Sequence, residues 1–504
     1  MMALKKPTDE TTLKDLLNGL ATVNDTDDRS ITGLSNDSRH IKHGDLFIAN
    51  KGQLYDATEF IQNAADAGAS AALVDSGFDF EARVYSIPVT KVEDLSAKSG
   101  IIADRFYRHP SAALKVTGIT GTNGKTSTAF FIAQALNKLN ANKVSVIGTL
   151  GIGMPGNIQH GVNTTPDALT IHREIRSMQT KGVNNLVMEV SSHALEQKRV
   201  AGVKFDIAVF TNLSREHLDY HGDMAMYANA KRQLFLAESL SAVVINIDDE
   251  FGQELVNEFQ EKLSVLTYGL DGNSIPKQAG NHISGKIIAS EVGLLSVDVT
   301  SPWGEGNIRC ALTGEFNVSN LLASLAVLCV SGIELDTALQ LLSKTEAVPG
   351  RMECFSKKGE AKVIVDYAHT PDALQKSLQS LRNLTKGRLI CVVGCGGDRD
   401  PGKRPIMAKI AETFSDKTIF TNDNPRNENP ETIVTQMLSG VEDRESIRVI
   451  LDRAEAIRLA ISSALADDVI LVAGKGHETY QEIANVRTPF SDRQLVRNLL
   501  EQRG

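Results

Sequence analysis

Short apolar runs alternate along most of this chain with segments of helical spacing, starting at about Val116. The runs are rich in β-branched residues, which is typical of strands in a parallel sheet that is buried on both faces. They occupy residues 186–188, 207–210, 243–247, 362–365, 389–393 and 469–472. Between them, apolar residues recur with helical spacing, as at Ile132, Ala135, Leu136 and Leu139. This alternation predicts βαβ units and doubly wound parallel sheets, which is an α/β fold.

Two breaks in the pattern predict domain boundaries near residues 110 and 346. A helical stretch ends at a proline in Tyr107-Arg-His-Pro110, and a helical region ends in a Pro-Gly turn in Ala347-Val-Pro-Gly-Arg351. At roughly 100–200 residues per domain, 504 residues suggest about three domains. We therefore predict a small mixed α/β domain over 1–110, a central domain over 111–346 and a C-terminal domain over 347–504. The pattern is weakest in the first, which has turn-rich segments around Gly44-Asp45 and Lys51-Gly52.

The composition excludes several classes of protein. A formal net charge of −9 argues against a general nucleic-acid binder, although a local basic site for phosphate remains compatible with it. The five cysteines are scattered without a CxxC pair, so neither a zinc knuckle nor a disulfide framework is expected. The first ten residues contain two lysines and no apolar segment, and we find no apolar run of about 18 residues. We therefore expect a cytoplasmic protein without a signal peptide or membrane span.

The strongest local motif is a glycine loop between a strand and a helix, in Val116-Thr-Gly-Ile-Thr-Gly-Thr-Asn-Gly-Lys-Thr126. Glycines let backbone N–H groups turn toward phosphate oxygens, and a helix N-terminus adds partial positive charge. Lys125 is placed to reach the β- and γ-phosphates, and the Thr126 hydroxyl to bind Mg²⁺. The general P-loop has glycine six residues before the lysine, where this chain has Ile119. The loop is therefore a variant, and an ordinary glycine turn is the alternative.

Motifs in the same order along the chain resemble the Mur ligase family, which shares its central fold with folylpolyglutamate synthetases. The resemblance runs from about residue 30 to the C-terminus. Besides the loop Thr120-Gly-Thr-Asn-Gly-Lys-Thr126, it rests on Met188-Glu-Val-Ser-Ser-His193, Thr211-Asn-Leu-Ser-Arg-Glu-His-Leu-Asp219, Leu312-Thr-Gly-Glu-Phe-Asn317, Asp366-Tyr-Ala-His-Thr-Pro371, Gly394-Cys-Gly-Gly-Asp-Arg399, Asp423-Asn-Pro-Arg426 and Gly474-Lys-Gly-His-Glu478. It implies an N-terminal UDP-binding domain, a central ATP-binding domain and a C-terminal Rossmann-like domain that binds the amino acid.

The resemblance implies a Mg²⁺ ion bound with the nucleotide phosphates. The implied metal ligands are Thr126, Glu189, His217 and Lys231, of which Glu189 fits best because Mg²⁺ prefers oxygen ligands. Family members carry a carbamate on the lysine that Lys231 matches. Such a modification requires a lysine with a depressed pKa, and it turns a cation into an anionic ligand. Without the resemblance, Lys231 would be a solvated surface lysine and His217 a structural histidine.

The remaining implied site residues fall into three groups. The nucleotide group is Gly121, Thr122, Asn123, Gly124, Lys125, Thr126, Ser127, Asn317 near adenine, Arg351 near phosphate and Asp366 near ribose, with a structural linker arginine as the alternative for Arg351. The UDP-substrate group is Ser38, Thr164, Thr165, Ser191, Gln197 and Arg199. Many family members have Asp-Gly-His where this chain has Asp56-Ala-Thr58, and Asn163-Thr-Thr-Pro-Asp167 is also a plausible helix start.

The third group predicts which amino acid is added. Asp423-Asn-Pro-Arg426 resembles the signature of members that add meso-diaminopimelate, with Arg399, Gly474 and Glu478 completing the set. Diaminopimelate differs from lysine by a second carboxylate, which the guanidinium of Arg426 can bind with two hydrogen bonds. An unpaired buried charge costs roughly 3–5 kcal/mol, so this contact could give a selectivity of about 10²–10³. An ordinary Asn-Pro turn with a surface arginine is the alternative.

Together these features predict an ATP-dependent amide-bond ligase that adds meso-diaminopimelate to UDP-MurNAc-L-Ala-D-Glu for peptidoglycan synthesis, and so serves cell shape and division. ATP would phosphorylate the D-Glu γ-carboxylate, and the amine would attack the acyl phosphate. No GxSxG elbow or similar nucleophile motif is present, and none is needed. A lysine-adding or later-acting ligase, a P-loop phosphotransferase and a non-catalytic UDP-peptide binder are the alternatives. We expect a monomer.

Overall fold

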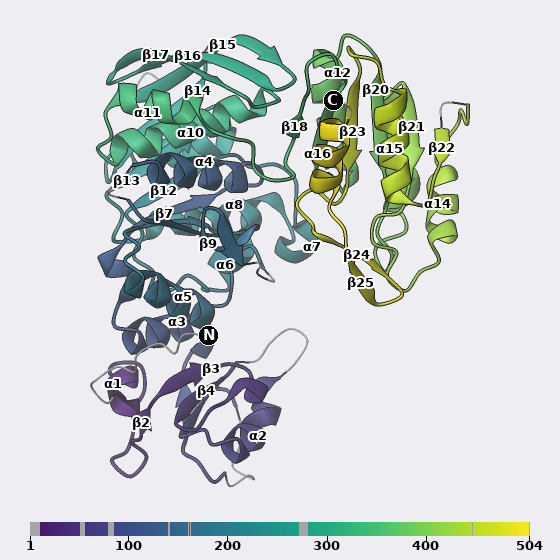
Figure 1. Cartoon of the computed structure of the whole chain (residues 1–504). Coiled ribbons are helices and arrows are strands. Elements are labelled where there is room, and N and C mark those ends of the chain that lie inside the picture. Colours follow the sequence, from purple (N-terminus) through teal and green to yellow (C-terminus); the bar gives the residue numbers. More distant parts are fainter. Residues whose placement is uncertain are drawn as a thin grey trace. The chain divides into compact units, whose positions relative to one another are not determined.

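The computed structural model describes residues 11–50, 56–78, 85–139, 142–159, 161, 163–271, 281–445 and 447–502 (Figure 1). The predicted turn at Lys51-Gly52 and the first ten residues lie outside them. Contacts divide the chain into two compact units, residues 1–129 with 136–266, and residues 130–135 with 267–504. The predicted boundaries at 110 and 346 do not coincide with this division and stay predictions. Among the described residues, no helix is long and apolar enough to cross a bilayer.

The first part of unit 1 is a four-stranded parallel sheet in the order β3-β4-β5-β6. Its strands are β3 (Gly33–Ser35), β4 (Asp45–Ala49), β5 (Ala71–Asp75) and β6 (Val89–Val92). It is accompanied by α1 (Leu13–Leu17), α2 (Ile61–Asp66), α3 (Leu95–Phe106) and the short pair β1 (Thr11–Thr12) and β2 (Ser30–Ile31). Alternate residues of β4 enter different apolar clusters, Leu46 and Ile48 on one face and Phe47 and Ala49 on the other. This sheet is therefore buried on both faces, as its βαβ connections require.

The larger sheet of unit 1 has the order β10-β9-β8-β11-β7-β12-β13. Its strands are β7 (Lys115–Thr120), β8 (Val144–Gly148), β9 (Gly151–Met154), β10 (Asn157–Gln159), β11 (Asn185–Glu189), β12 (Ile207–Phe210) and β13 (Ala242–Asn246). Its helices are α4 (Lys125–Asn137), α5 (Ala168–Thr180), α6 (Ser192–Glu196), α7 (Leu218–His221), α8 (Met224–Arg232) and α9 (Glu250–Phe259). Strands β8, β11, β7, β12 and β13 run parallel, so the ends of β7, β8, β11 and β12 lie at one edge. The predicted strands at 186–188, 207–210 and 243–247 are confirmed to within a residue at each end.

Unit 2 begins with four strands in the order β14-β15-β16-β17, of which the last three form an antiparallel meander. The elements are β14 (Ser264–Leu270), β15 (His282–Glu291), β16 (Leu294–Ser301), β17 (Gly304–Cys310), α10 (Phe316–Val330) and α11 (Leu335–Ser343). This meander was not predicted, because its strands are not continuous apolar runs. Strand β16 instead buries every second residue along most of its length, as a strand exposed on one face does.

The rest of unit 2 is a six-stranded sheet in the order β18-β19-β23-β20-β21-β22, parallel except for β18. Its strands are β18 (Glu353–Phe355), β19 (Lys362–Asp366), β20 (Leu389–Val393), β21 (Lys417–Phe420), β22 (Ile447–Val449) and β23 (Val469–Ala473). Its helices are α12 (Pro371–Leu384), α13 (Lys403–Phe414), α14 (Pro430–Leu438), α15 (Arg453–Ser463) and α16 (Asp492–Gln502), and β24 (Tyr480–Ile483) and β25 (Val486–Pro489) form a hairpin.

Strand β23 shows how this sheet is buried on both faces. Val469 and Leu471 pack in a cluster with residues of α12, α13 and α14, while Ile470 and Val472 pack with residues of α15 and α16. The β-branched run at 469–472 is therefore buried on both faces of the sheet, as its composition predicted. The doubly wound α/β fold and the predicted strands at 362–365, 389–393 and 469–472 are confirmed.

Candidate active site

The glycine loop joins the end of β7 to the start of α4, as predicted. Gly121 and Gly124 have φ angles of 149° and 84°, which an L side chain rarely adopts. A Cβ on Gly121 would lie 1.9 Å from Thr211 Oγ1, so the loop also requires glycine for space. Lys125 Nζ donates hydrogen bonds to the carbonyls of Gly121 (2.7 Å) and Thr122 (2.8 Å). The ammonium therefore lies over the loop, beside the helix N-terminus whose first N–H groups have no partner within the helix.

The segment after β12 holds the loop in this shape. Thr211 Oγ1 donates to the carbonyl of Asn123 at 2.6 Å. Asn212 accepts from the N–H of Asn123 through Oδ1 (2.9 Å) and from the N–H of Thr122 through its carbonyl (2.8 Å). These bonds occupy the N–H groups of Thr122 and Asn123, so phosphate oxygens would bind to the other N–H groups of the loop. The predicted nucleotide residue Ser127 is half-buried in the first turn of α4.

Glu189 ends β11 beside this loop, with 2% of the residue exposed. Its Oε2 accepts hydrogen bonds from Thr126 Oγ1 (2.8 Å) and Thr149 Oγ1 (3.1 Å), and its Oε1 accepts from the Thr149 N–H (2.8 Å). The structure thus brings the predicted metal ligands Thr126 and Glu189 into direct contact. A buried carboxylate with remaining lone pairs beside a phosphate loop is the oxygen-rich setting that Mg²⁺ prefers.

Lys231, near the end of α8, is buried with 1% of the residue exposed, so the alternative of a solvated surface lysine is wrong. Burial, followed by the charge of Lys125, lowers the pKa of this amine well below its ordinary value, while Glu216 acts in the opposite direction. Lys231 Nζ lies 4.2 Å from the ring centroid of Tyr227, whose hydroxyl is 3.2 Å from Thr122 Oγ1. Among the described residues, no carboxylate forms an ion pair with Lys231. The chain therefore holds a largely desolvated amine close to the loop.

His217 differs from its predicted companions. Its side chain is 46% exposed and its backbone has a φ of 56°. Its ring packs edge-on against His193, with the centroids 4.8 Å apart, and Nε2 lies 3.8 Å from a carboxylate oxygen of Glu216. Among the contacts of the described residues, none joins His217 to Glu189, so the role of His217 as a metal ligand stays a prediction.

Four of the predicted UDP-substrate residues lie on the loop after β10, which carries Thr165, and around α6, which Ser191 caps and which Gln197 and Arg199 follow. Thr165 Oγ1 donates to the Glu189 carbonyl (2.8 Å) and accepts from the Ser191 N–H (3.1 Å), so its hydroxyl is occupied by the backbone. Arg199 donates to Gln197 Oε1 through Nε (2.9 Å) and to the Thr165 carbonyl through Nη1 (3.0 Å). Burial lowers the pKa of Arg199. These four residues form one polar network, joined partly through the Thr165 carbonyl and the Ser191 N–H.

The other two predicted UDP-substrate residues are placed separately. Thr164 Oγ1 lies 3.1 Å from Thr149 Oγ1, and Ser38 begins a short 3-10 helix that Asp37 caps. Asp167 caps α5 by accepting from the Thr170 N–H, which confirms the helix start in this segment. The departure from Asp-Gly-His lies at Ala57 and Thr58, and both the backbone N–H and the hydroxyl of Thr58 donate to Asp56 Oδ1.

Three predicted nucleotide residues belong to unit 2. Asn317, in the first turn of α10, donates to the Thr313 carbonyl at 2.9 Å. The guanidinium of Arg351 lies 4.6 Å from the ring centroid of Tyr367, and its buried Nε has no hydrogen-bond partner among the described residues. Asp366 ends β19, and its two oxygens accept from the Met352 N–H (3.0 Å) and Ser377 Oγ (2.7 Å).

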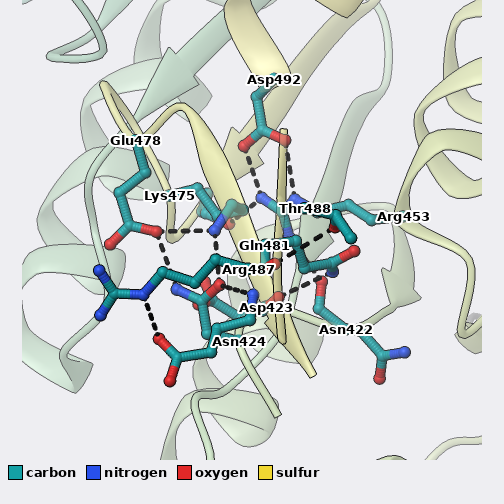
Figure 2. Close-up of polar contacts among 12 residues, drawn as sticks. Asn422, Asp423, Asn424, Arg453, Lys475, Glu478, Gln481, Arg487, Thr488 and Asp492 are labelled. Carbon is teal, nitrogen blue, oxygen red and sulfur yellow. Dashed lines mark hydrogen bonds and ion pairs between the residues drawn. The ribbon is translucent and has the colours of Figure 1, made fainter. Parts of the chain in front are cut away.

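The predicted amino-acid residues follow the ends of β20, β21 and β23 in the sequence, and Figure 2 shows Asp423, Asn424 and Glu478 among them. Asn424 Nδ2 donates to Glu478 Oε2 at 2.9 Å, and Asn424 is 1% exposed. The Asp423 carbonyl accepts from Gln481 Nε2 at 2.8 Å. A Cβ on Gly474, whose φ is 116°, would lie 2.5 Å from Asp423 Oδ2. Residues more than 50 positions apart thus form one polar cluster.

Arg426 lies at the edge of this cluster in a left-handed conformation, with a φ of 51°. Its N–H donates to the Glu482 carbonyl (3.0 Å) and its carbonyl accepts from the Ala484 N–H (2.6 Å), so the β24–β25 hairpin holds its backbone. Nη1 donates to the Gly397 carbonyl at 2.6 Å. Together with Ile483 and residues 427–431, it lines a pocket of about 410 Å³. Arg399 lies in the loop after β20, and a Cβ on Gly396 would contact both arginines.

Comparison with known proteins identifies the family. Three family models match the chain: the Mur ligase family catalytic domain over residues 30–107, the Mur ligase middle domain over 119–328 and the Mur ligase glutamate ligase domain over 350–476. This chain belongs to the Mur ligase family. The gaps between the matched segments contain positions 110 and 346, where the sequence predicted boundaries.

Relatives of this Mur ligase match over nearly all of its length. The UDP-N-acetylmuramoyl-L-alanyl-D-glutamate–2,6-diaminopimelate ligase of Coxiella burnetii is 46% identical over 93% of this chain and 95% of its own. That of Pseudomonas aeruginosa is 44% identical over 92% and 94%. A solved structure of a ligase with the same name is 32% identical, with a TM-score of 0.73 over 98% and 99%. The MurF ligase of Thermotoga maritima, solved in complex with ADP, is 20% identical with a TM-score of 0.58 over 96% and 100%, which shows the shared fold.

Sequence reasoning about this Mur ligase missed several residues that organise the site. Thr149 donates two hydrogen bonds to Glu189, and it follows β8, whose end lies at the same sheet edge. Lys475 stands inside the motif Gly474-Lys-Gly-His-Glu478, yet nothing in its local sequence indicated that its side chain would be fully buried. The run that forms β8 was not among the predicted strands, so nothing drew attention to the polar residue that follows it at the carboxyl end of the sheet.

Proposed function

We propose that this Mur ligase uses ATP to join meso-2,6-diaminopimelate to the γ-carboxylate of D-Glu in UDP-MurNAc-L-Ala-D-Glu, a step of peptidoglycan precursor synthesis. The names of the 42–46% identical relatives support this substrate pair. The arrangement of Thr126, Glu189 and Lys231 around the glycine loop is the single observation that carries the ligase chemistry. It provides a site for a triphosphate and a metal ion without any protein nucleophile.

The described residues fit a Mg²⁺ ion at the glycine loop. The Thr126 hydroxyl and the Glu189 carboxylate are 2.8 Å apart, and both are oxygen ligands of the type that Mg²⁺ binds. The buried Lys231 amine fits only after carbamylation, because a free ammonium would repel the cation. Its lowered pKa favours the neutral amine that reacts with CO₂. The ion, when bound, neutralises charge on the phosphates.

The chain's own groups supply charge and position. In the first step, the substrate carboxylate attacks the γ-phosphorus of ATP, which gives an acyl phosphate and ADP. In the second step, the amine attacks the acyl carbon, and inorganic phosphate leaves from the tetrahedral intermediate. Lys125 and the N–H groups at the start of α4 bind phosphate oxygens and lower the repulsion between the two reacting anions. Asn317, Arg351 and Asp366 remain our proposed contacts to the nucleotide.

The second substrate is the amino acid, and the loops after β20, β21 and β23 select it. We assign Arg426 to the far carboxylate of diaminopimelate and Glu478 to its far ammonium. Arg399, Asp423, Asn424, Pro425 and Gly474 complete this proposed site. Lysine lacks the far carboxylate, so it would leave the Arg426 guanidinium without its anionic partner.

The test measures phosphate release from ATP in the presence of UDP-MurNAc-L-Ala-D-Glu and either diaminopimelate or lysine. The wild type should prefer diaminopimelate, and Arg426→Ala should reduce that preference about 10²–10³-fold, because it removes a charge pair worth roughly 3–5 kcal/mol. Arg448→Ala, which changes an exposed arginine on β22, should leave the preference unchanged. Equal discrimination in wild type and Arg426→Ala would refute the role of Arg426.

The same assay separates the rival functions. A lysine-adding ligase would prefer lysine, and a phosphotransferase would yield a stable phosphorylated product with no requirement for the amino acid. A non-catalytic binding protein would be unaffected by Lys125→Ala, whereas the ligase should lose several orders of magnitude of activity, since that ammonium compensates phosphate charge. A monomer in the cytoplasm remains our expectation, and light scattering of the purified chain tests the monomer.

A further inference from the structure

Lys475 is a fully buried lysine on the loop after β23, between Gly474 and Gly476. Its Nζ donates hydrogen bonds to Glu478 Oε2 at 2.6 Å and to Asn424 Oδ1 at 2.9 Å. Its side chain also lies over the ring of Tyr480, with Nζ 5.6 Å from the centroid. Buried lysines are rare and need a paired charge, so this ammonium depends on the Glu478 carboxylate.

The three side chains of Lys475, Asn424 and Glu478 form a closed triangle (Figure 2). The third side is the bond from Asn424 Nδ2 to Glu478 Oε2, and Asn424 Oδ1 also accepts from the Glu482 N–H at 3.0 Å. An ammonium only donates and a carboxylate only accepts, so the two neighbours determine which way the Asn424 amide faces. Each member of the triangle therefore holds the other two in one arrangement.

The triangle leaves one carboxylate oxygen of Glu478 available to a ligand. Oε2 accepts from both Lys475 and Asn424, whereas Oε1 accepts no hydrogen bond among the residues that the structure describes. The Glu478 side chain is 20% exposed, while that of Lys475 is 0% exposed. The inner oxygen is thus bound to the protein and the outer oxygen remains for a ligand.

We propose that Lys475 is a positioning residue for diaminopimelate. It does not touch the amino acid; it aims the outer oxygen of Glu478 at the far ammonium, and it keeps the Asn424 amide in the orientation that supports this. This inference rests on the proposed function, since it assigns a supporting role within the same amino-acid site. The charge of Lys475 also prevents the inner side of the Glu478 carboxylate from being buried without a partner.

A purely structural lysine makes a different prediction from a positioning one. Loss of a structural contact would lower stability and the fraction of active enzyme, which reduces kcat for all substrates alike. Loss of a positioning contact would raise KM for diaminopimelate while KM for ATP stays the same. The separation of these constants therefore distinguishes the two roles.

The experiment measures KM and kcat by phosphate release for Lys475→Met, Glu478→Gln and the double variant, each checked for folding by circular dichroism. Lys475→Met should raise KM for diaminopimelate about 10- to 100-fold, the range for losing a hydrogen bond to a charged group. KM for ATP and kcat at saturating diaminopimelate should stay within about threefold. Because Lys475 acts through Glu478, adding Lys475→Met to Glu478→Gln should change KM by less than about threefold. If Lys475→Met does not fold, Lys475→Gln, which keeps N–H donors, replaces it in the same cycle.

Arg388→Met is the matched control. Arg388 pairs with the buried Asp468 where β20 and β23 begin, and the proposed amino-acid residues lie where these strands end. Arg388→Met therefore tests whether a general weakening of this sheet changes KM. It should leave KM for diaminopimelate unchanged. An active wild type with unchanged KM in Lys475→Met, or additive effects in the double variant, would overturn the inference alone. A wild type that releases no phosphate with diaminopimelate would refute the proposed function and the inference together.

Discussion

The buried ion pair between Arg453 and Asp492 gives the most quantitative prediction about this protein. Both side chains are 0% exposed. Arg453 Nε donates to Asp492 Oδ1 at 2.8 Å and Nη2 donates to Oδ2 at 2.7 Å, which is a bidentate pair between the starts of α15 and α16. Asp492→Asn would leave the guanidinium buried without an anion. Breaking such a pair costs about 3–5 kcal/mol.

The magnitude converts into a measurable shift in thermal unfolding. For a folding unit of about 150–250 residues, 1 kcal/mol corresponds to about 2–4 °C, so Asp492→Asn should lower the melting temperature by about 6–20 °C. Hydrogen exchange should locate the loss of protection in α15 and α16. Asp372→Asn is the control, because it removes an exposed pair with Lys376 that is worth about 1 kcal/mol or less.

The double variant Arg453→Met/Asp492→Leu separates stability from function. Replacing both charges with apolar side chains should restore most of the melting temperature, because the desolvation penalty disappears with the charges. Arg453 also donates to the carbonyls of Asn422 (3.2 Å) and Ala473 (2.9 Å), each directly before a proposed diaminopimelate residue (Figure 2). The double variant should therefore still show a KM for diaminopimelate raised about 10-fold. A melting temperature within about 2 °C of wild type for Asp492→Asn would refute the reasoning.

Two further predictions concern the nucleotide site. Gly121→Ala should abolish ATP binding measured by calorimetry, because its Cβ would lie 1.9 Å from Thr211 Oγ1. Gly156 also has a positive φ (88°), but its added Cβ would meet no described atom within 4 Å, so Gly156→Ala should bind ATP normally. In CO₂-free buffer at neutral pH, Lys231→Met should melt at a higher temperature than wild type, since burial lowers the pKa of this amine. The unfolded chain binds that proton more tightly, so wild-type stability rises with pH from the folded-state pKa toward 10.5, and the difference between the two proteins should shrink over that window. A constant difference, or the same behaviour in the exposed control Lys417→Met, would contradict this account.

Local sequence was enough to predict several strands that are buried on both faces of a sheet, although β4 and β8, which are equally buried, were not predicted. Continuous β-branched runs such as 469–472 have no exposed face, so their composition alone indicates their environment. The glycine loop was equally predictable, because the positive φ angles of Gly121 and Gly124 are a local requirement on residue type. The meander β15–β17 was missed because its strands alternate between buried and half-exposed residues.

The sequence by itself determined the α/β class, the phosphate loop and, through its ordered motifs, the family. Only the tertiary structure decided which polar residues are buried and paired. Lys231 and Lys475 have nothing in their neighbouring sequence that indicates burial, yet each is at most 1% exposed. The partners of Lys475 include Asn424, 51 positions away, and Thr126 meets Glu189 across 63 positions. Contacts over such separations depend on the order of the strands in the sheet, which no local pattern specifies.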